Sequence, residues 1–489
     1  MKRRTKPSVL FSLAAGALVL GAAGVPRAAV GHAAATWTGT ITMYAHDYTP
    51  NSTVENKDNL KAFRQVADAY QKSHPGVIIN FVDQTYTDPY QTYRVKAAAG
   101  EMFDIWWGQW AALNSTLPRG IAVDLTPYYK QKNPYILGNT AWQNAMNATV
   151  VNETQAPNGA HYNINGDFVG TAFFYNKDLF KKAGISGTPS TWQQLLADCA
   201  KLKKAGITPV TGVPLHGWFV RHWLSDFYAQ DFSKIVGYGG KGSSGMSALD
   251  EAVAIKKGVL SAKDPRFLAW WPIFKGLAGY WDKQYLTQDT STSDDPTRQE
   301  FISGQAGIYY SGSWIPNYLK NAKVSFTWGT FPWPTLNKAV SPYAHGINTA
   351  GYVGGPNADY QYAISTPKAD KSMAQPGKTE AVLDWLRYIG TPTVLQQVVN
   401  EKGTYVPTWP GTKPKGGGNG TFAAEANQTL HVITIGNASA QEDPAIQKAF
   451  SLYLGGDLSI QQAKTQVQAA LDAAANDFAK TNGVDLSKY

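Results

Sequence analysis

The chain has 489 residues and a formal charge of +9, but residues 1–35 hold five cations and no acid, so the remaining 454 residues carry only +4. Apart from the short segment Thr412–Lys415, no dense run of Lys and Arg is present, which argues against nucleic-acid binding. The single cysteine, Cys199, excludes an internal disulfide framework. The length exceeds one ordinary hydrophobic core and favours two large lobes.

The N-terminus has the form of an export signal. A basic start, Lys2–Arg4, precedes the apolar run Val9–Val25, and Ala33–Ala35 offers a small-x-small cleavage site. We expect residues 1–35 to be a signal peptide and Thr36 to be the first mature residue. The alternative is an uncleaved anchor, because the apolar run is only slightly shorter than the ~20 residues that span a bilayer.

The next part of the chain alternates predicted strands and helices. The strands are Thr40–His46, Val77–Asp83 and Phe103–Gly108, and the helices between them are Asn59–Lys72 and Pro89–Gly100. Alternating units of this kind form a parallel sheet with right-handed crossovers. The sequence therefore predicts an open α/β sheet for the first lobe.

Polar and aromatic side chains follow these strands, where ligands of open α/β sheets bind. The residues at the strand ends are His46-Asp47, Asp83-Gln84 and Trp106–Trp110. We expect Asp47, Gln84, Trp107 and Trp110 to line one wall of a ligand site.

A strand–helix–helix unit follows between residues 170 and about 204. The strand Gly170–Tyr175 ends at Asn176, a good N-cap for the short helix Lys177–Ala183. Ser190, three residues before Gln193, has the spacing of a capping box for a second helix. The apolar face of that helix comprises Trp192, Leu195, Leu196, Cys199 and Leu202. Cys199 is therefore expected to be a core residue and not a reactive thiol.

The amino-acid sequence of this unit, FVGTAFFYNKDLFKKAGISGTPSTW, resembles that of the extracellular solute-binding proteins of ABC importers, in particular the carbohydrate-binding group that includes maltose-binding protein. The resemblance spans nearly the whole chain. It recurs in AYQKSHPGVIINF (Ala69–Phe81), KAAAGEMFDIWW (Lys96–Trp107), GIAVDLTPYY (Gly120–Tyr129), FISGQAGIYYSGSW (Phe301–Trp314) and LGGDLSIQQAKTQVQAALDAA (Leu454–Ala474).

The resemblance implies a two-lobed periplasmic-binding-protein fold of type II, with a parallel-rich sheet flanked by helices in each lobe. Lobe 1 would comprise residues 36–164 and 357–405, and lobe 2 residues 165–356 and 406–489. About three crossings would form the hinge, near Asp167, in the glycine-containing segment Gly351–Pro356, and at Tyr405–Pro407.

Further site residues follow from the resemblance. Asp167 matches a polar contact at the first crossing, and Trp314, after Ser-Gly-Ser, matches a tryptophan that stacks on the ligand. Trp218 and Tyr352 complete the candidate set. Indole rings suit the apolar faces of a pyranose, and carboxylates suit its hydroxyls.

The implied function is capture of a carbohydrate, an oligosaccharide in particular, for an ABC import permease. The chain lacks a Walker-type Gly-x4-Gly-Lys-Ser/Thr run, so the ATPase subunit is expected on a separate chain. We expect a monomer with no catalytic residues, metal or cofactor. It would be exported to the periplasm or the outer face of the cytoplasmic membrane, and not lipidated, because no cysteine follows the signal.

Two alternatives remain open at this stage. A secreted glycoside hydrolase would share the aromatic residues and the signal, and needs two carboxylates ~5–10 Å apart, for example Asp167 and Asp47. The same fold could also bind a peptide, a polyamine or a metal chelate.

Overall fold

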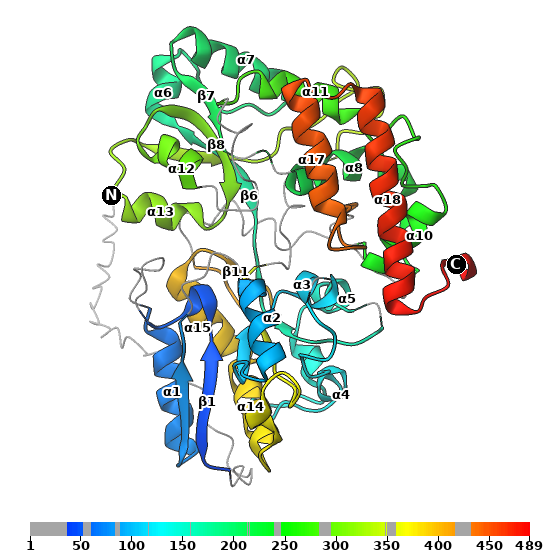
Figure 1. The fold of residues 1–489 in the computed structure, drawn as a ribbon. Helices are drawn as coiled ribbons and strands as arrows, with labels where there is room; N and C mark the ends of the chain where they lie inside the picture. Colours follow the sequence, from blue (N-terminus) through cyan, green and yellow to red (C-terminus); the bar gives the residue numbers. More distant parts are fainter. Residues whose placement is uncertain are drawn as a thin grey trace, which may run out of the picture.

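The computed structural model describes residues 37–51, 60–83, 89–115, 117–156, 158–212, 214, 216–238, 246–282, 295–347, 349, 358–415 and 432–489. The expected signal peptide, Gln84 and Tyr352 lie outside these residues. The chain forms two lobes, with β1, α1 and α14 in the lower one and β6, β7 and α7 in the upper one (Figure 1). Each lobe has its own sheet, so the predicted two-lobed α/β fold is confirmed.

The lower lobe is built on a five-stranded sheet. Its strands are, in spatial order, β2 (Val77–Phe81), β1 (Gly39–Tyr44), β3 (Ile105–Trp107), β10 (Gln361–Ile364) and β4 (Ile164–Asn165). β1 pairs in parallel with β2 and β3, which confirms the predicted parallel arrangement. β10, which comes from much later in the chain, runs antiparallel to both β3 and β4.

Helices from both parts of the chain cover this sheet. They are α1 (Ala62–Ser73), α2 (Pro89–Ala99), α3 (Trp110–Ser115), α4 (Thr126–Tyr129), α5 (Ala148–Glu153), α14 (Lys378–Ile389) and α15 (Pro392–Lys402), with 3₁₀ turns η1 (His46–Tyr48), η2 (Trp142–Ala145) and η5 (Lys371–Ala374). The helix predicted over Asn59–Lys72 corresponds to α1, which buries Phe63, Val66 and Tyr70. α1 therefore packs on the sheet through a stripe with helical spacing.

The upper lobe is built on a four-stranded sheet. Its strands are β7 (Thr208–Thr211), β8 (Ala306–Gly312), β6 (Thr171–Asn176) and β9 (Trp328–Phe331), in that order. β7 and β8 pair in parallel, whereas β6 runs antiparallel to β8 and β9. The expectation of a parallel-rich sheet is therefore wrong for this lobe, because β6, in the middle of the sheet, runs opposite to both of its neighbours. The helices are α6 (Lys177–Lys182), α7 (Trp192–Lys204), α8 (His216–Phe227), α9 (Phe232–Ile235), α10 (Ala248–Lys256), α11 (Trp270–Ala278), α12 (Asp295–Ile302), α13 (Ile315–Asn321), α17 (Glu442–Gly455) and α18 (Ile460–Asn482), with 3₁₀ turns η3 (Ala229–Asp231) and η6 (Leu486–Lys488).

Two predicted helix starts can be compared with the structure. The Asn176 side chain accepts hydrogen bonds from the N–H groups of residues 178 and 179, so the predicted cap of α6 is confirmed. The predicted capping box of α7 is wrong by one residue. Thr191 is the N-cap, and Gln194 completes the box. Both pairs have the required spacing, but Thr191 holds the extended backbone of an N-cap, and Ser190 instead donates to the Gln194 side chain.

Three segments connect the lobes. The chain leaves the lower sheet after β4 and enters the upper sheet at β6, returns between β9 and β10, and passes again between α15 and α17. Two of these segments pair directly, because β5 (Asp167–Phe168) forms an antiparallel ladder with β11 (Val406–Pro407). The connections therefore lie close together near the middle of the molecule, where Figure 1 places β11.

Most of the large aromatic side chains that can be placed lie in the cores. The tryptophans with less than 2% exposure are Trp106, Trp142, Trp192, Trp223, Trp270, Trp271, Trp385 and Trp409. Cys199 is also fully buried, which confirms its expected place in the core. Burial raises the pKa of this thiol, which makes it unreactive. The high tryptophan content is therefore explained largely by packing.

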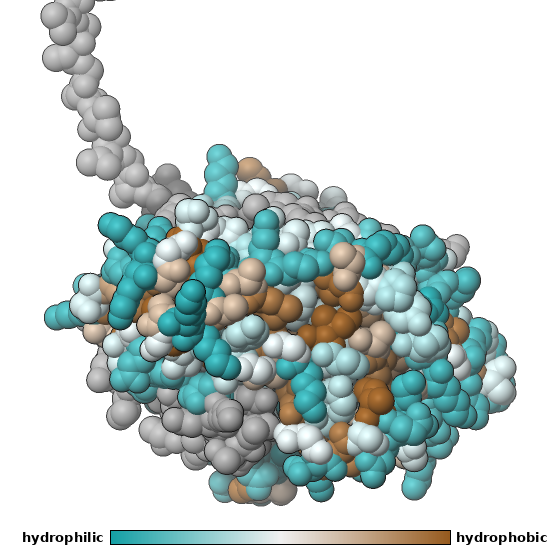
Figure 2. Space-filling view, turned by 90° about the horizontal axis from the view of Figure 1, so that it is seen from above, coloured by the Kyte–Doolittle hydropathy of each residue, from teal (hydrophilic) through white to brown (hydrophobic). Residues whose placement is uncertain are grey.

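Seen from above Figure 1, the surface is mostly hydrophilic, with small apolar patches between hydrophilic side chains (Figure 2). Within the described residues, no helix combines the length and the apolar character that crossing a bilayer requires.

Candidate functional site

The end of β1 places a histidine beside one of the predicted tryptophans. His46 has a left-handed backbone (φ 50°), which is uncommon for a residue with a side chain. Its imidazole lies flat on the Trp107 indole, with ring centroids 3.9 Å apart and planes 9° apart. Trp107 is only 6% exposed. The predicted site residue Trp107 therefore supports His46, and the histidine ring covers its face.

Asp359, from the second connection, holds His46 and its neighbour in place. An Asp359 carboxylate oxygen lies 2.9 Å from His46 Nδ1 and accepts a hydrogen bond from the Asp47 N–H at 3.0 Å. Burial lowers the pKa of His46, but the charge of Asp359 and its hydrogen bond more than offset this, so the pKa is raised from its ordinary value. The Nδ1 contact leaves Nε2 as the ring nitrogen available to a ligand.

Asp47, predicted from the strand end, is engaged by the third connection. Its carboxylate lies 2.9 Å from Lys402 Nζ and accepts a hydrogen bond from the Tyr405 hydroxyl at 3.1 Å. Burial raises the pKa of Asp47, but the positive charges of Lys402 and His46 lower it by more, so the net pKa is below its ordinary value. The carboxyl group is therefore ionised at neutral pH. Ligand atoms of His46, Asp47 and Asp359 lie within 4.8 Å of one another, close enough to hold a metal ion, although Lys402 already supplies a positive charge there.

Asp167, predicted at the first connection, is fully buried. It accepts hydrogen bonds from the Tyr48 hydroxyl at 2.5 Å and from the N–H groups of Tyr360 at 2.8 Å and Asp359 at 3.1 Å. Burial raises its pKa to about 7, although the bond from Tyr48 opposes this. All of these partners belong to the protein, so a ligand could reach Asp167 only if one of the bonds opened. In this structure the residue ties two connections to the end of β1.

On the upper lobe, the structure brings together two of the predicted tryptophans. Trp218 of α8 and Trp314, just before α13, are half-buried and meet edge to face, with ring centroids 5.7 Å apart and planes at 76°. Trp314 packs against apolar residues of both lobes. The pair therefore lies at the junction of the lobes and presents partly open aromatic surface.

Arg221 lies one helical turn after Trp218 and was not in the predicted set. Its Nε donates to Thr434 Oγ1 at 3.3 Å, and no other hydrogen bond from its side chain is seen among the described residues. Burial lowers the pKa of Arg221, whereas the acidic Asp443 and Glu153 raise it. Glu153 belongs to α5 of the lower lobe, so Arg221 lies within electrostatic reach of both lobes.

The remaining predicted residues do not join these groups. Trp110 begins α3 and is half-buried, and its N–H donates to the Gln361 side chain. Its indole Nε1 is buried and has no hydrogen-bond partner in the part of the chain that the structure describes. Gln84 and Tyr352 lie outside the described residues, so their predicted roles stay predictions.

Sequence reasoning missed most of the polar network around Asp47. Its unpredicted members are His46, Tyr48, Asp359, Lys402 and Tyr405. His46 was noted at the strand end but not chosen as a site residue, and Tyr48, on the other side of Asp47, could have been found from the same position. Asp359 and Lys402 join the network only because β10 and α15 return to the lower lobe, which local patterns do not reveal.

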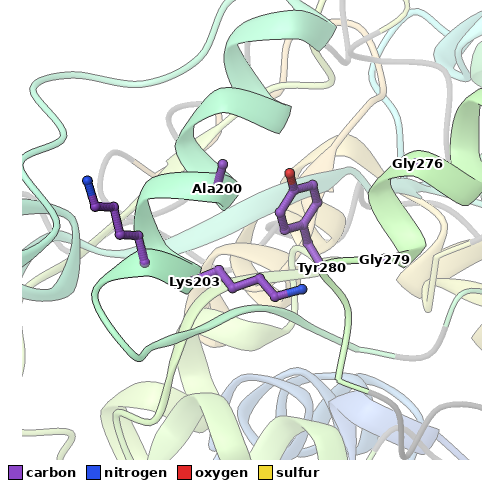
Figure 3. A pocket seen from close by; sticks show the side chains of 6 residues that line it. Ala200, Lys203, Gly276, Gly279 and Tyr280 are labelled. Carbon is purple, nitrogen blue, oxygen red and sulfur yellow. The ribbon is translucent and has the colours of Figure 1, made fainter.

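A separate hollow lies on the upper lobe between α7 and α11 (Figure 3). It has a volume of about 560 Å³ and is lined by Ala200, Lys203, Lys204, Gly276, Gly279 and Tyr280. Lys203 Nζ lies over the Tyr280 ring, 5.5 Å from its centroid. In Figure 1 these helices lie at the top of the upper lobe, away from β11, so the hollow does not belong to the site at the connections.

Comparisons with known proteins agree with this architecture. The family model described as "Bacterial extracellular solute-binding protein" matches residues 55–394. A binding protein of Brucella abortus is 24% identical over 271 residues, which span 55% of this chain and 58% of the relative, so the chain matches little more than half of that curated relative's length.

Solved structures share the fold at low sequence identity. A chitin oligosaccharide binding protein superposes with a TM-score of 0.60 at 18% identity, over 90% of this chain and 99% of the other. The GacH receptor of Streptomyces glaucescens, described unliganded and in complex with acarbose, superposes with a TM-score of 0.58 at 15% identity, over 90% and 99%.

Proposed function

Because the chain belongs to the bacterial extracellular solute-binding protein family, we propose that it captures a carbohydrate, an oligosaccharide in particular, between its lobes. The observation that carries this proposal is the half-buried pair Trp218 and Trp314 at the junction of the lobes, with Arg221 one turn away. Two structural neighbours, the chitin oligosaccharide binding protein and the receptor described in complex with acarbose, support the same ligand class.

Sugar chemistry fits these residue types. The C–H face of a pyranose buries apolar area against an indole, and an aromatic ring loses little rotamer freedom when it does so. Hydroxyls at the ring edge need donors and acceptors, which His46 Nε2 of the lower lobe and the guanidinium of Arg221 can provide. Charge-assisted bonds of this kind are the stronger ones. In this proposal the aromatic pair covers the sugar face, and the polar groups read its edge.

The transport role is part of the proposal. The protein would act outside the cytoplasm after loss of residues 1–35 and would deliver its ligand, as a monomer, to the permease of an ABC importer with a separate ATPase subunit. It would bind its ligand and not cleave it. The lobes would be residues 36–164 with 357–405, and 165–356 with 406–489.

A ligand screen tests the proposal. Thermal shift of the purified protein against mono- and oligosaccharides should give a rise in Tm with at least one of them, because a ligand that binds only the native state stabilises it by mass action. Peptides, polyamines and metal chelates in the same screen cover the other ligand classes. A rise with one of these and none with any sugar would contradict the carbohydrate assignment.

Variants then locate the site. Trp314→Ala should weaken binding of the screened sugar about tenfold or more in calorimetry, from ~1–3 kcal/mol of lost aromatic contact. Tyr318→Ala, which removes an exposed aromatic from α13 nearby, should leave the affinity unchanged. Chromatography of the sugar after long incubation checks for cleavage, and the appearance of products would favour a hydrolase.

A further inference from the structure

Two carboxyl groups face each other inside the upper lobe, near Arg221 but outside the set of residues assigned to the ligand. Glu251 of α10 is fully buried, and Glu442, the first residue of α17, is 2% exposed. The segment at Gly436 brings them together, because the Gly436 N–H donates to Glu251 and Gly436 lies against the side chain of Asp443, the neighbour of Glu442. Each carboxyl group also shifts the pKa of the other. Ionised carboxylates only accept hydrogen bonds, so the contact needs a proton or a cation between them.

The two acids have different surroundings. The Glu251 oxygens accept hydrogen bonds from the N–H groups of Gly436 at 2.7 Å and Asn437 at 2.9 Å. Among the described residues, neither buried carboxyl oxygen of Glu442 has a donor in good hydrogen-bond geometry, although the Gly436 N–H lowers the pKa of Glu442. Glu251 is thus stabilised as an acceptor, and Glu442 is the member that gains most from carrying a proton.

The charged groups around the pair strengthen this assignment. Asp443, the next residue of α17, is acidic and raises the pKa of Glu442 further, after burial and Glu251. Arg221 of α8 acts on Asp443 and, at longer range, on Glu251. Ionising the carboxyl groups of Glu251, Glu442 and Asp443 together, with one guanidinium nearby, would cost a large free energy inside a protein.

We propose that Glu251 and Glu442 share one proton in the native protein, with Glu442 as its carrier. This proton would hold residues 434–438 in place beside Arg221. The pair joins α10 to α17, and Glu251 holds the backbone of Gly436 and Asn437. The same segment contains Thr434, which positions Arg221 through Nε. The two acids are therefore positioning residues for Arg221, and only this last consequence rests on the proposed function.

The shared proton makes stability depend on pH in a defined direction. Burial raises the pKa of Glu442 well above its ordinary value and that of Glu251 to about 7. An acid with a raised native pKa stabilises the fold fully below its unfolded pKa, and this contribution is lost as the pH rises through the native value. One such proton changes the unfolding equilibrium constant roughly tenfold per pH unit within that window.

Two matched variants test the proposal by urea unfolding between pH 4 and pH 9, without any ligand. In Glu442→Gln the amide donates permanently to Glu251, so the variant should fold. Its unfolding free energy should depend less steeply on pH than that of the wild type, by the contribution of one proton. In Glu251→Gln the amide N–H₂ must face backbone donors, so this variant should be less stable at every pH. Titrating groups elsewhere are common to all three proteins and cancel in the comparison.

The opposite outcomes are equally clear. An unchanged pH dependence in Glu442→Gln, or equal stability of the two glutamine variants, would overturn the shared proton. A Tm that rises with Ca²⁺ and falls with EDTA in the wild type, and responds to neither in Glu442→Gln, would mean that the pair holds a cation instead. With a sugar from the screen, Glu251→Gln should bind more weakly than Glu442→Gln; equal affinities would overturn the positioning of Arg221 alone.

Discussion

Gly312, the last residue of β8, allows Trp314 to lie across the strand, and Gly312→Ala should displace that indole. A Cβ built at Gly312 would lie 1.9 Å from Cζ3 and 2.2 Å from Cη2 of Trp314. Carbon atoms in contact prefer about 3.5 Å or more, so the ring must move by more than about 1.5 Å. The Gly312 backbone does not have a positive φ, so alanine itself is tolerated there.

The expected losses follow from this collision. Overpacking should cost about 1–3 kcal/mol of unfolding free energy. If Trp314 covers the sugar, its displacement should also weaken binding by about tenfold or more, as Trp314→Ala does. In a Trp314→Ala background the ring is gone, so adding Gly312→Ala should change neither quantity further.

Urea unfolding and calorimetry on the two single variants and the double variant measure this coupling. Gly307→Ala is the matched control on the same strand, because its Cβ would instead meet the Leu202 side chain at 2.7 Å. It should lower stability and leave affinity unchanged. If Gly312→Ala is equally harmful with and without Trp314, the substitution acts through other contacts and the reasoning fails.

Three further predictions concern the connections between the lobes. Burial raises the native pKa of Asp167 to about 7, so the unfolding free energy of the wild type should fall by at most about 4 kcal/mol between pH 4 and pH 7. Asp167→Asn can still accept from the Tyr360 N–H and donate to Tyr48, and it should lack this fall in urea unfolding; a variant that keeps it would show that Asp167 titrates normally. Lys402→Met removes the partner of the half-exposed Asp47 and should cost about 2 kcal/mol in the same assay, part of which Asp47→Asn in the same chain should restore; no recovery would argue against the ion pair. A sugar found in the screen should reduce the radius of gyration in small-angle scattering, because it would draw the lobes together, and an unchanged radius would indicate a rigid or already closed form.

Local patterns predicted the elements of the lower lobe well. The runs Thr40–His46, Val77–Asp83 and Phe103–Gly108 correctly predicted β1, β2 and β3, and Phe63, Val66 and Tyr70, at helical spacing, lie on the buried face of α1. Asn176 marked the start of α6 because its cap is formed within three residues. These features depend on residues that are close in the sequence, so they can be predicted without knowledge of the fold.

The candidate site was less accessible to sequence reasoning. Trp218 and Trp314 were named separately, but their edge-to-face contact depends on the packing of α8 beside β8. Asp167 was placed correctly at a connection, yet its partners Tyr48 and Tyr360 lie far away in the sequence. Polar residues were predicted to face a ligand, whereas burial at the connections directs many of them toward each other.

The position of β10 also bears on how the chain can fold during synthesis. β10 lies between β3 and β4, so β4 is joined to the lower sheet through a strand that is made only after the whole upper sheet. Until Gln361–Ile364 has emerged, the edge of β3 remains open and the lower core lacks α14 and α15. Such non-local pairing is slow because a long loop must close first. The nascent chain should therefore remain incompletely folded until late in translation, with the upper lobe able to form its sheet before the lower one is complete.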